Sequence, residues 1–439
     1  MSVRYDRLVP ALKALLPDAP LTQLGRAVAF IRRLREIQAS AFVWSVVLSR
    51  FGSGRPGFEQ ARHWYGRLTG GMLWPRPFQI RFKSAAAVRL FERAFEDAVR
   101  PWRARTRVRH PLARQFADIA VIDSTILQLS DALRPVFKGA RGAASSLKAL
   151  LTISVFGLVP LHAEVVSGNR HDMTFFPALD LFVKGTLLLF DKGFVAYDRL
   201  RQITDASLLY LCPMRLNGNA IVTHARRAPK YVRQALRRHP EGLWLRDLLP
   251  AKKRIGKAWD LDVVLWPKTA ARARQQVPCR LVLVPGPKQT QRPYLTNLTA
   301  SQWPARALAE IYRLRWQVEL VFKELKQHLN LEALPSKDRH AVQVFAWASL
   351  IALALSRTVT TCLCPLTQLV GLAPQLRPAL VSRALRSTVR LLARALSAPP
   401  TRARDLLGIF AEEVALEIRA RDPGREDSFQ RLLPLLSAA

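Results

Sequence analysis

The chain has 439 residues, 49% of them hydrophobic, so it is long enough for one large domain with insertions or for two to three units. It carries 68 Lys and Arg against 32 Asp and Glu, a formal net charge of +36. A chain so charged repels itself unless a polyanion neutralises it, and nucleic acid is the commonest such partner. Ribosome-like structural binding and membrane-surface binding are weaker alternatives, because neither needs a carboxylate cluster.

Cysteine usage and hydropathy narrow the expected location. The four cysteines are too few and too scattered for a disulfide framework, and Cys362 and Cys364 lack a second ligand pair at zinc spacing. The N-terminus shows no apolar signal core, and the longest apolar run, Ala341 to Leu355, is shorter than the roughly 20 residues that a bilayer needs. We therefore predict a cytoplasmic protein, with this run as a buried core helix and no membrane segment.

Residues 1–110 are predicted to be helical and basic. Segments such as Leu21–Gln38 and Ala85–Val99 carry apolar residues three and four positions apart, with basic residues between them. A basic helical unit at this place indicates a DNA-binding region that recognises a specific site.

Residues 111–215 change to a β-type pattern, in which short apolar runs are separated by turn formers such as Gly157 and Pro160. The fourth run, Thr186–Asp191, is nearly all apolar, as is typical of a strand covered on both faces. Three strands followed by alternating strand and helix is the order of an RNase H-like α/β core. The predicted elements are strands over 117–123, 148–158, 160–166, 186–191 and 208–212 and a helix over 197–203.

The order of elements breaks between residues 216 and 300. This region is rich in Arg and Lys, and strand-like pieces such as Leu261–Trp266 predict a mostly β insertion in the core. Its closing strands are expected over Arg280–Val284 and Pro293–Leu298.

One long helix is predicted to follow, from about Pro304 to Leu329, within a core segment of residues 301–340. Pro304 suits the first turn of a helix. Residues 341–439 are again expected to be helical and basic.

Four chemically distinct side chains share one face of that predicted helix. At about 100° per residue, Tyr312, Arg315, Glu319 and Lys326 fall within about 60° of one another. A carboxylate so placed could bind a metal ion while the phenol and the cations hold phosphates. An ordinary solvated face, with Glu319 and Lys323 as an i,i+4 ion pair, explains the same residues. The first interpretation requires further carboxylates elsewhere in the chain.

Two aspartates meet this requirement at the ends of predicted strands. Asp123 ends the first apolar run and Asp191 ends the fourth. α/β folds place their chemistry at the carboxyl ends of core strands, where the sheet holds a side chain rigidly. With Glu319 from a helix beside the sheet, three carboxylates could hold two divalent metal ions, and their oxygens suit Mg²⁺ or Mn²⁺. Taken singly, either aspartate is as well explained as a turn former or N-cap.

The conjunction of these residues resembles a known family. The spacing Tyr312-x₂-Arg315-x₃-Glu319-x₆-Lys326, preceded by Val121-Ile122-Asp123-Ser124-Thr125 and Asp191-Lys192-Gly193-Phe194, is similar to the signature of IS4-type DDE transposases of bacterial insertion sequences. The resemblance covers about residues 117–330. The long separation of Asp191 from Glu319 leaves room for the predicted insertion.

The resemblance implies an RNase H-like catalytic core interrupted by the mostly β insertion, with helical N- and C-terminal regions. It implies a metal-dependent DNA transposase that cleaves phosphodiester bonds at insertion-sequence ends and joins the 3′-hydroxyl ends to target DNA by two-metal catalysis. Asp123, Asp191 and Glu319 would be the catalytic residues and the metal ligands, holding two Mg²⁺ (or Mn²⁺) ions.

The same resemblance implies DNA contacts. Tyr312, Arg315 and Lys326 would hold phosphates at the transposon end. Trp316 would stack on a base or, as an equal alternative, lie in the core. Tyr294 is the nearest candidate for the aromatic residue that some relatives apply to a flipped base during hairpin formation.

Double-stranded DNA, as transposon terminal repeats and as target, is the implied partner. A homodimer is expected in the DNA-bound synaptic complex, in a bacterial cytoplasm, associated with the nucleoid and not with a membrane. Two alternatives remain open. One is a catalytically inactive transposase-derived DNA-binding protein, and the other is an RNase H-like structure-selective DNA nuclease.

Overall fold

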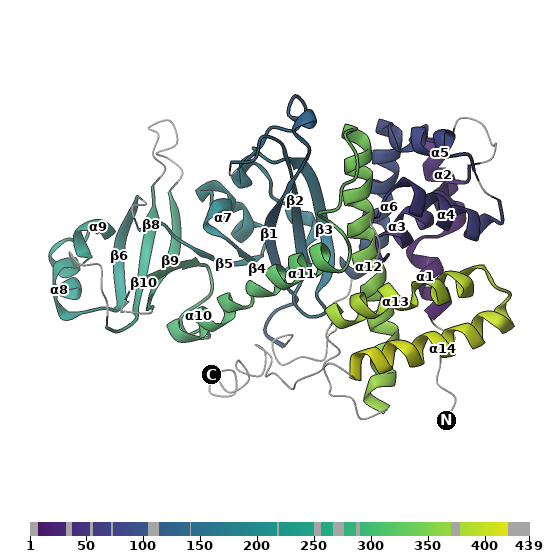
Figure 1. Cartoon of the computed structure of the whole chain (residues 1–439). Coiled ribbons are helices and arrows are strands. Elements are labelled where there is room, and N and C mark those ends of the chain that lie inside the picture. Colours follow the sequence, from purple (N-terminus) through teal and green to yellow (C-terminus); the bar gives the residue numbers. More distant parts are fainter. Residues whose placement is uncertain are drawn as a thin grey trace.

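The computed structural model of the chain places a large mixed sheet beside a body of helices (Figure 1). It describes residues 8–31, 37–52, 56–71, 73–103, 114–140, 142–216, 219–249, 256–266, 276–286, 290–369 and 378–419. Within these ranges only the backbone is described at 364–369, 400, 415, 418 and 419. The predicted α/β class with helical regions at both ends is confirmed.

The N-terminal part is largely helical, as the spacing of its apolar residues predicted. The helix expected over Leu21–Gln38 is wrong in extent, because α2 ends at Ala27, and residues 32–36 lie outside the described residues. On α6, Leu90, Phe91 and Phe95 are fully buried, while Arg93 on the other face is exposed. Helix α3 is apolar all round and is buried along its whole length. The helices are α1 (Leu8–Leu15), α2 (Asp18–Ala27), α3 (Ala39–Ser49), α4 (Phe58–Thr69), α5 (Pro75–Phe82) and α6 (Ala85–Arg103).

Five strands form the part of the sheet that follows. Their spatial order is β3-β2-β1-β4-β5, in which β2 pairs antiparallel with β1 and β3, and β4 pairs parallel with β1 and β5. All four residues of β4 are buried, as predicted for a strand covered on both faces. The strands are β1 (Ile119–Gln128), β2 (Ser146–Ser154), β3 (Val159–Ser167), β4 (Leu187–Phe190) and β5 (Leu209–Pro213). Helix α7 (Tyr197–Asp205) and the 3₁₀ turns η3 (Asp131–Leu133), η4 (Asp172–Thr174), η5 (Leu179–Leu181) and η6 (Lys192–Phe194) lie in the connections.

The strands of the predicted insertion continue the same sheet. β10 pairs antiparallel with β5, with Leu295 opposite Cys212, and thereby covers an edge that would otherwise leave backbone groups unpaired. Buried Arg280 of β9 donates to both carboxylate oxygens of Asp260 on β8, at 2.9 and 2.6 Å. The elements are β6 (Ala220–Arg227), α8 (Lys230–Arg238), β7 (Leu243–Trp244), α9 (Leu245–Leu248), β8 (Trp259–Leu265), β9 (Val277–Pro285) and β10 (Gln291–Thr296).

The single helix predicted over Pro304–Leu329 is divided into α10 (Ala305–Arg313) and α11 (Trp316–Gln327). The division falls at Leu314 and Arg315, whose N–H groups each donate to a carbonyl three residues back, at 3.0 Å. Three-residue hydrogen bonds make a tighter turn than an α-helix does. The expectation of one regular helix is therefore wrong. The angles calculated for Tyr312, Arg315, Glu319 and Lys326 on a single helix do not apply, because Tyr312 lies before this turn and Glu319 and Lys326 lie after it.

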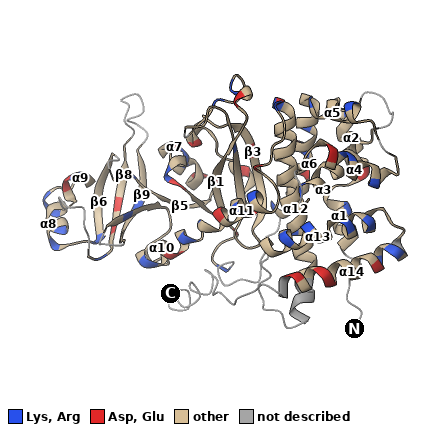
Figure 2. Cartoon of the chain, in the orientation of Figure 1, with Lys and Arg blue, Asp and Glu red and all other residues tan. Residues whose placement is uncertain are grey.

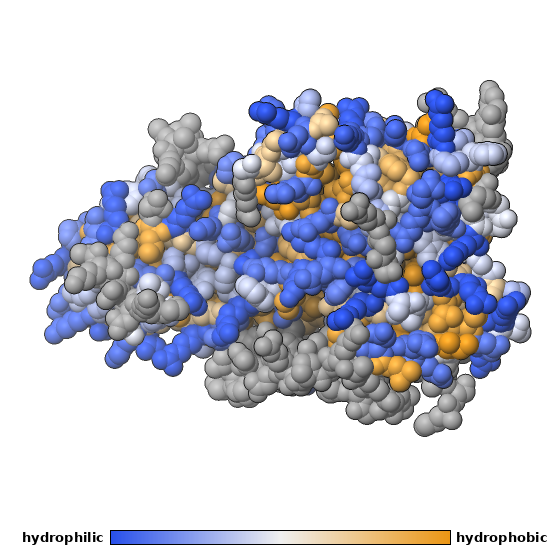
Figure 3. Space-filling view, viewed as in Figure 1, coloured by the Kyte–Doolittle hydropathy of each residue, from blue (hydrophilic) through white to orange (hydrophobic). Residues whose placement is uncertain are grey.

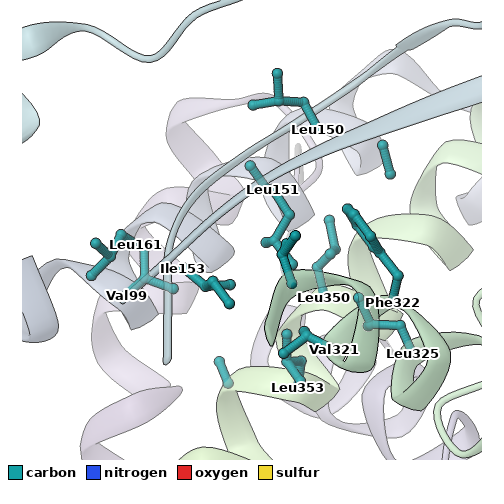
Figure 4. Close-up of a cluster of buried hydrophobic side chains, with 14 of the residues drawn as sticks. Val99, Leu150, Leu151, Ile153, Leu161, Val321, Phe322, Leu325, Leu350 and Leu353 are labelled. Atoms are coloured by element: carbon teal, nitrogen blue, oxygen red, sulfur yellow. The ribbon is translucent and has the colours of Figure 1, made fainter. Parts of the chain in front are cut away.

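Residues from both ends of the chain form one helical body around α12 (Arg339–Leu369). This helix packs against α1, α3 and α6, against α13, and against strand β3. Figure 4 shows part of the shared core, with Val99 from α6, Leu161 from β3, Val321 from α11 and Leu350 from α12. The last two helices are α13 (Pro378–Ser397) and α14 (Pro400–Arg419), which pack together.

Helix α12 contains the long apolar run. Among the described residues one stretch, Arg339–Leu363, is long and apolar enough to cross a membrane, but 89% of its most apolar part is buried inside the protein. The helix extends beyond Leu355, and the side chain of Arg357 is paired within the core. The prediction of a buried core helix is confirmed.

Candidate active site

The two predicted aspartates follow the last paired residues of adjacent parallel strands. The pairing of β1 with β4 ends at Ile122 and Phe190, so Asp123 and Asp191 come next on the two strands. Asp123 does not end its strand, contrary to expectation, because β1 stays paired with β2 as far as Gln128. Both carboxylates nevertheless stand where the parallel part of the sheet ends.

Helix α11 brings Glu319 to the same place, and Arg315 joins it to the sheet. The guanidinium of Arg315 donates to Asp123 Oδ2 at 2.6 Å and to Glu319 Oε1 at 2.5 Å. The side chains of Arg315, Asp123 and Glu319 are 20%, 18% and 34% exposed. We call these three residues the open cluster. Arg315, expected on a phosphate, lies here between two carboxylates.

Negative charge accumulates around Asp123. Burial raises the pKa of its carboxyl group to about 6, and the charges of Asp191 and Glu319 add to the rise. A hydrogen bond from the N–H of Ser124 and the charge of Arg315 act in the opposite direction. Asp191 and Glu319 are therefore each close enough to influence Asp123, a setting that a bound cation stabilises.

Another face of α11 is fixed by a buried ion pair. Arg357 of α12 donates two hydrogen bonds of 2.7 Å to the two oxygens of Glu324, and the side chains are 0% and 2% exposed. Ser382 of α13 also donates to Glu324, and Arg357 donates to the carbonyl of Leu158 in the turn between β2 and β3. We call Arg357, Glu324 and Ser382 the sealed cluster.

Sequence reasoning missed the sealed cluster, although a signal was present. Arg357 interrupts a long apolar stretch of a helix, and a buried cation requires a buried anionic partner. Which carboxylate supplied it could not be read from the spacing.

Tyr312 and Tyr294 pack together next to Asp191. The hydroxyl of Tyr312 donates to the carbonyl of Phe190 at 3.5 Å, and the two tyrosine rings lie 5.0 Å apart. Burial raises the pKa of Tyr312 far above its ordinary value, and the charge of Asp191 contributes to the rise. Tyr312 is half-buried, whereas Tyr294, on β10, is only 6% exposed and lies in the interior.

An open groove of about 540 Å³ follows α11 from the carboxylates. Asp123 and Glu319 line it together with Lys323, Lys326 and Glu332, and Lys326 Nζ is 2.8 Å from a carboxylate oxygen of Glu332. Hydrophilic side chains cover the surface over α11 in Figure 3. The groove thus presents both signs of charge to a ligand.

Trp316 begins α11 and is 58% exposed. The alternative that placed this ring in the core is therefore wrong. An exposed indole is free to stack on a ligand.

A fourth carboxylate next to the aspartates was also missed. Asp172 Oδ1 accepts hydrogen bonds from Ser124 Oγ at 3.0 Å and from Lys148 Nζ at 2.8 Å. Lys148 is 6% exposed, so η4, β1 and β2 are tied together beside Asp123. A Cβ at Gly193 would lie 3.2 Å from Asp172 Oδ2, so the segment after Asp191 also fits closely here. The overlooked signal is a lysine within the apolar strand β2.

The donor set suits a hard divalent cation by its chemistry, since it consists of carboxylate oxygens. In the described part of the chain, no three His, Cys, Asp or Glu side chains are grouped closely enough to hold a metal ion as they stand. The guanidinium of Arg315 already lies between Asp123 and Glu319 as a monovalent cation. The residues therefore fit a cation at this point, and Arg315 must move before both carboxylates could bind the same ion.

Fold and site together define an α/β protein with carboxylates gathered beside an open groove, and comparison with known proteins gives the family. Residues 114–355, more than half of the chain, match the family described as Transposase DDE domain. The chain belongs to this transposase family.

Two relatives illustrate the range of similarity. The transposase for insertion sequence element IS231F of Bacillus thuringiensis subsp. israelensis is 21% identical over 371 residues, which are 76% of this chain and 76% of the relative. The transposase for insertion sequence element IS421 of Escherichia coli is 43% identical over 58 residues, 13% of this chain and 16% of the relative. The similarity to IS4-type DDE transposases inferred from the sequence is confirmed.

Among solved structures, the cryo-EM structure of the piggyBac transposase synaptic complex with hairpin DNA aligns with 98% of this chain and 84% of its own, at 10% identity and a TM-score of 0.38. So weak a likeness does not define the fold. Membership of the DDE family makes the protein a DNA transposase of a class that generally uses divalent metal ions.

Proposed function

We propose that this transposase cleaves phosphodiester bonds at the ends of an insertion sequence and joins the resulting 3′-hydroxyl ends to target DNA. The observation that supports the proposal is that Asp123 and Asp191 follow adjacent parallel strands, while Arg315 joins Asp123 to Glu319 beside an open groove. The net charge of +36 supports a polyanionic substrate.

The catalytic part is proposed to be an RNase H-like core. Support comes from the strand order β3-β2-β1-β4-β5, with three antiparallel strands followed by two parallel ones, and from α11 packed on β1. The insertion would then be the region from β6 to β10, which enlarges the same sheet.

Asp123, Asp191 and Glu319 are proposed to hold two Mg²⁺ or Mn²⁺ ions. Such ions, when bound, would supply activation of the attacking oxygen and stabilisation of the leaving oxygen of the phosphodiester. Arg315 keeps two of the carboxylates neutralised in the absence of another cation, because its guanidinium bonds to both. Once displaced, it is placed to hold a phosphate, as its position next to the groove favours.

The remaining predicted residues take different roles in this proposal. Lys326 lines the groove, and its ammonium group would leave Glu332 and bind a DNA phosphate. Exposed Trp316 stacks on a base. Tyr312 orients the end of β4 through the carbonyl of Phe190, and Tyr294 supports the Tyr312 ring from the interior.

The proposed partners are double-stranded terminal repeats and target DNA, bound by a homodimer that brings two ends together. A single active site beside one groove handles one end at a time, so synapsis of two ends needs a second copy.

The first prediction tests the catalytic assignment. Asp191→Ala should reduce cleavage of a duplex carrying the element's terminal sequence by about 10³-fold or more with Mg²⁺, because one of three carboxylates is lost. Binding of the same duplex should persist. Gel analysis of cut and bound DNA measures both quantities.

Asp180→Ala is the matched control, since Asp180 is exposed in turn η5. This variant should cut normally. Undiminished cutting by Asp191→Ala would contradict the assignment. Tight binding without cutting by the unaltered chain would favour the inactive DNA-binding alternative, and cutting of branched DNA whatever its sequence would favour the nuclease.

A further inference from the structure

A second groove lies between α4, α13 and α14, away from the carboxylates. It measures about 610 Å³ and adjoins a smaller groove of about 320 Å³. We call the two together the arginine cleft. Its lining includes Trp64 and Arg67 from α4, Arg386, Arg390 and Arg394 from α13 and Arg402 from α14.

The charged side chains that line the arginine cleft are all positive. No Asp or Glu lines either groove within the described ranges. Arg67 lies over the ring of Trp64, with its guanidinium carbon 5.2 Å from the ring centroid, which orients the guanidinium and leaves its N–H edge free for an acceptor. A concave surface with several guanidinium groups and no carboxylate concentrates anions.

The arginines of α13 form a regular row. Arg383, Arg386, Arg390 and Arg394 follow at steps of three, four and four residues, so they share one face of the helix. The opposite face is buried, as shown by Leu385 with 0% exposure. The row extends about 17 Å along the helix, close to the rise of about five base pairs of duplex DNA.

The row meets the candidate active site at its near end. The guanidinium of Arg386 donates to the carbonyl of Gln327 at 3.1 Å, and Gln327 lines the groove of Lys323 and Lys326. Figure 2 shows basic residues on both α11 and α13, which lie next to each other. Cationic side chains therefore continue from the carboxylates along α11, onto α13 and into the arginine cleft.

We propose that the arginine cleft binds the phosphate backbone of the DNA duplex that leads away from the cleavage point. The proposal rests on the proposed function and adds a second contact region to it. Arginine suits this task because its planar fork matches two phosphate oxygens, and such contacts fix the position of a duplex without reading its sequence. The N-terminal helix α4 and the C-terminal helices thereby bind one ligand together.

The test uses the full chain with three substitutions, Arg67→Gln, Arg390→Gln and Arg394→Gln. Its affinity for a random-sequence duplex of about 30 base pairs is measured against salt concentration, in chelator without metal. The logarithmic salt slope should fall by about 2–3, and binding near 0.1 M salt should weaken by roughly tenfold, because each lost phosphate contact removes about 0.9 from the slope.

A matched control carries Arg233→Gln, Arg237→Gln and Arg238→Gln. These three residues are exposed on α8, at the far end of the sheet from α13, and their loss changes the net charge by the same amount (Figure 1). Its salt slope should change by less than about 1, since exposed charges beyond about 10 Å are screened at this ionic strength. Equal losses in the two variants would overturn the proposal.

A measurement on the unaltered chain guards against misfolding of the variant. An arginine-specific dicarbonyl reagent, followed by mass spectrometry, should modify Arg390 and Arg394 freely without DNA and at least about fivefold more slowly with it, as buried phosphate contacts require. Arg237 should react equally in both cases. Equal reactivity of Arg390 with and without DNA would reject the cleft. Because no metal is present, loss of cleavage in Asp191→Ala and loss of protection here are separate results.

Discussion

The open cluster and the sealed cluster use the same chemical groups on two faces of α11. In the sealed cluster the Arg357 guanidinium donates two hydrogen bonds of 2.7 Å to one carboxylate, that of Glu324, and neither side chain is more than 2% exposed. In the open cluster the Arg315 guanidinium binds two carboxylates on different elements, and all three side chains are partly exposed to solvent. A buried pair is costly to break, whereas a solvated pair exchanges partners at little cost.

The difference assigns a separate task to each cluster. Through Glu324, the sealed cluster fixes α11 to α12 and α13 and thereby sets where Glu319 stands. The open cluster keeps Asp123 and Glu319 together while leaving them able to take another cation. A rigid support behind an exchangeable site is what metal-dependent chemistry requires.

The largest effect is expected from breaking the sealed cluster. Glu324→Ala should lower the free energy of unfolding by about 3–5 kcal/mol, because it leaves Arg357 buried without its partner. Urea denaturation measures the change. The double variant Glu324→Leu with Arg357→Met removes both charges and should recover most of the loss. A cost below about 1 kcal/mol for Glu324→Ala would show that the pair is not held as tightly as its burial implies.

An intermediate effect is expected at the contact between α6 and β3. His162 of β3 lies 3.1 Å from Glu96 of α6 and 3.4 Å from Glu164. Burial lowers the pKa of His162, but the bonds to Glu164 and Glu96 and their charges outweigh it and raise the pKa to about 9. A raised histidine pKa contributes stability that is complete below about pH 6.5 and is lost as the pH rises through about 9.

His162→Gln should therefore lower the free energy of unfolding by about 2–3 kcal/mol at pH 6, and by much less at pH 10. Denaturation of both proteins across this pH range gives the difference. A deficit that is the same at both pH values would show that the charge on His162 does not stabilise the contact. His239→Gln, at a half-exposed side chain beside Glu241, is the control and should change little at any pH.

The smallest effect on stability is expected in the open cluster. Arg315→Gln should change the free energy of unfolding by no more than about 1 kcal/mol, since the pair is partly solvated. Without the competing guanidinium, Mn²⁺ should raise the unfolding midpoint at pH 8 at severalfold lower concentration than in the unaltered chain. Calorimetry with and without Mn²⁺ tests both statements.

The control for this variant is Arg313→Gln, whose residue pairs with Glu310 on the exposed side of α10. It should leave the response to Mn²⁺ unchanged. A response to Mn²⁺ that is weaker in Arg315→Gln than in the unaltered chain would show that Arg315 assists the binding of the cation.

Strands were predicted closely where burial produces a continuous apolar run. Thr186–Asp191 differs from β4 (Leu187–Phe190) only at its ends, because both faces of this strand are covered. Asp123 was placed at a strand end because the polar residues after it interrupt the apolar pattern, yet β1 continues there beside β2. Periodicity reports which faces are buried, while strand length also depends on the partner strand.

The helix after the insertion shows the same limit. Its composition predicted helix correctly on both sides of Leu314, but it did not show the tight turn at Leu314 and Arg315, where the Arg315 side chain contacts Asp123 of the sheet. The roles of Asp123, Asp191 and Glu319 in catalysis stay predictions, as do the domain boundaries. So do the predicted DNA contacts of Tyr312, Arg315, Lys326, Trp316 and Tyr294.

By itself, the sequence determined the α/β class, the basic character, the family and the choice of Asp123, Asp191 and Glu319 as candidate site residues. These properties lie in residue chemistry, in local periodicity and in a spacing within one segment. Tertiary structure decided that Arg315 bridges Asp123 across 192 positions of sequence, that Arg357 pairs with Glu324, and that both ends of the chain build one helical body. An ion pair between residues far apart in the sequence produces no periodic pattern in it. Only the packing of the elements therefore shows which ion pairs are buried and which are exposed enough to exchange partners.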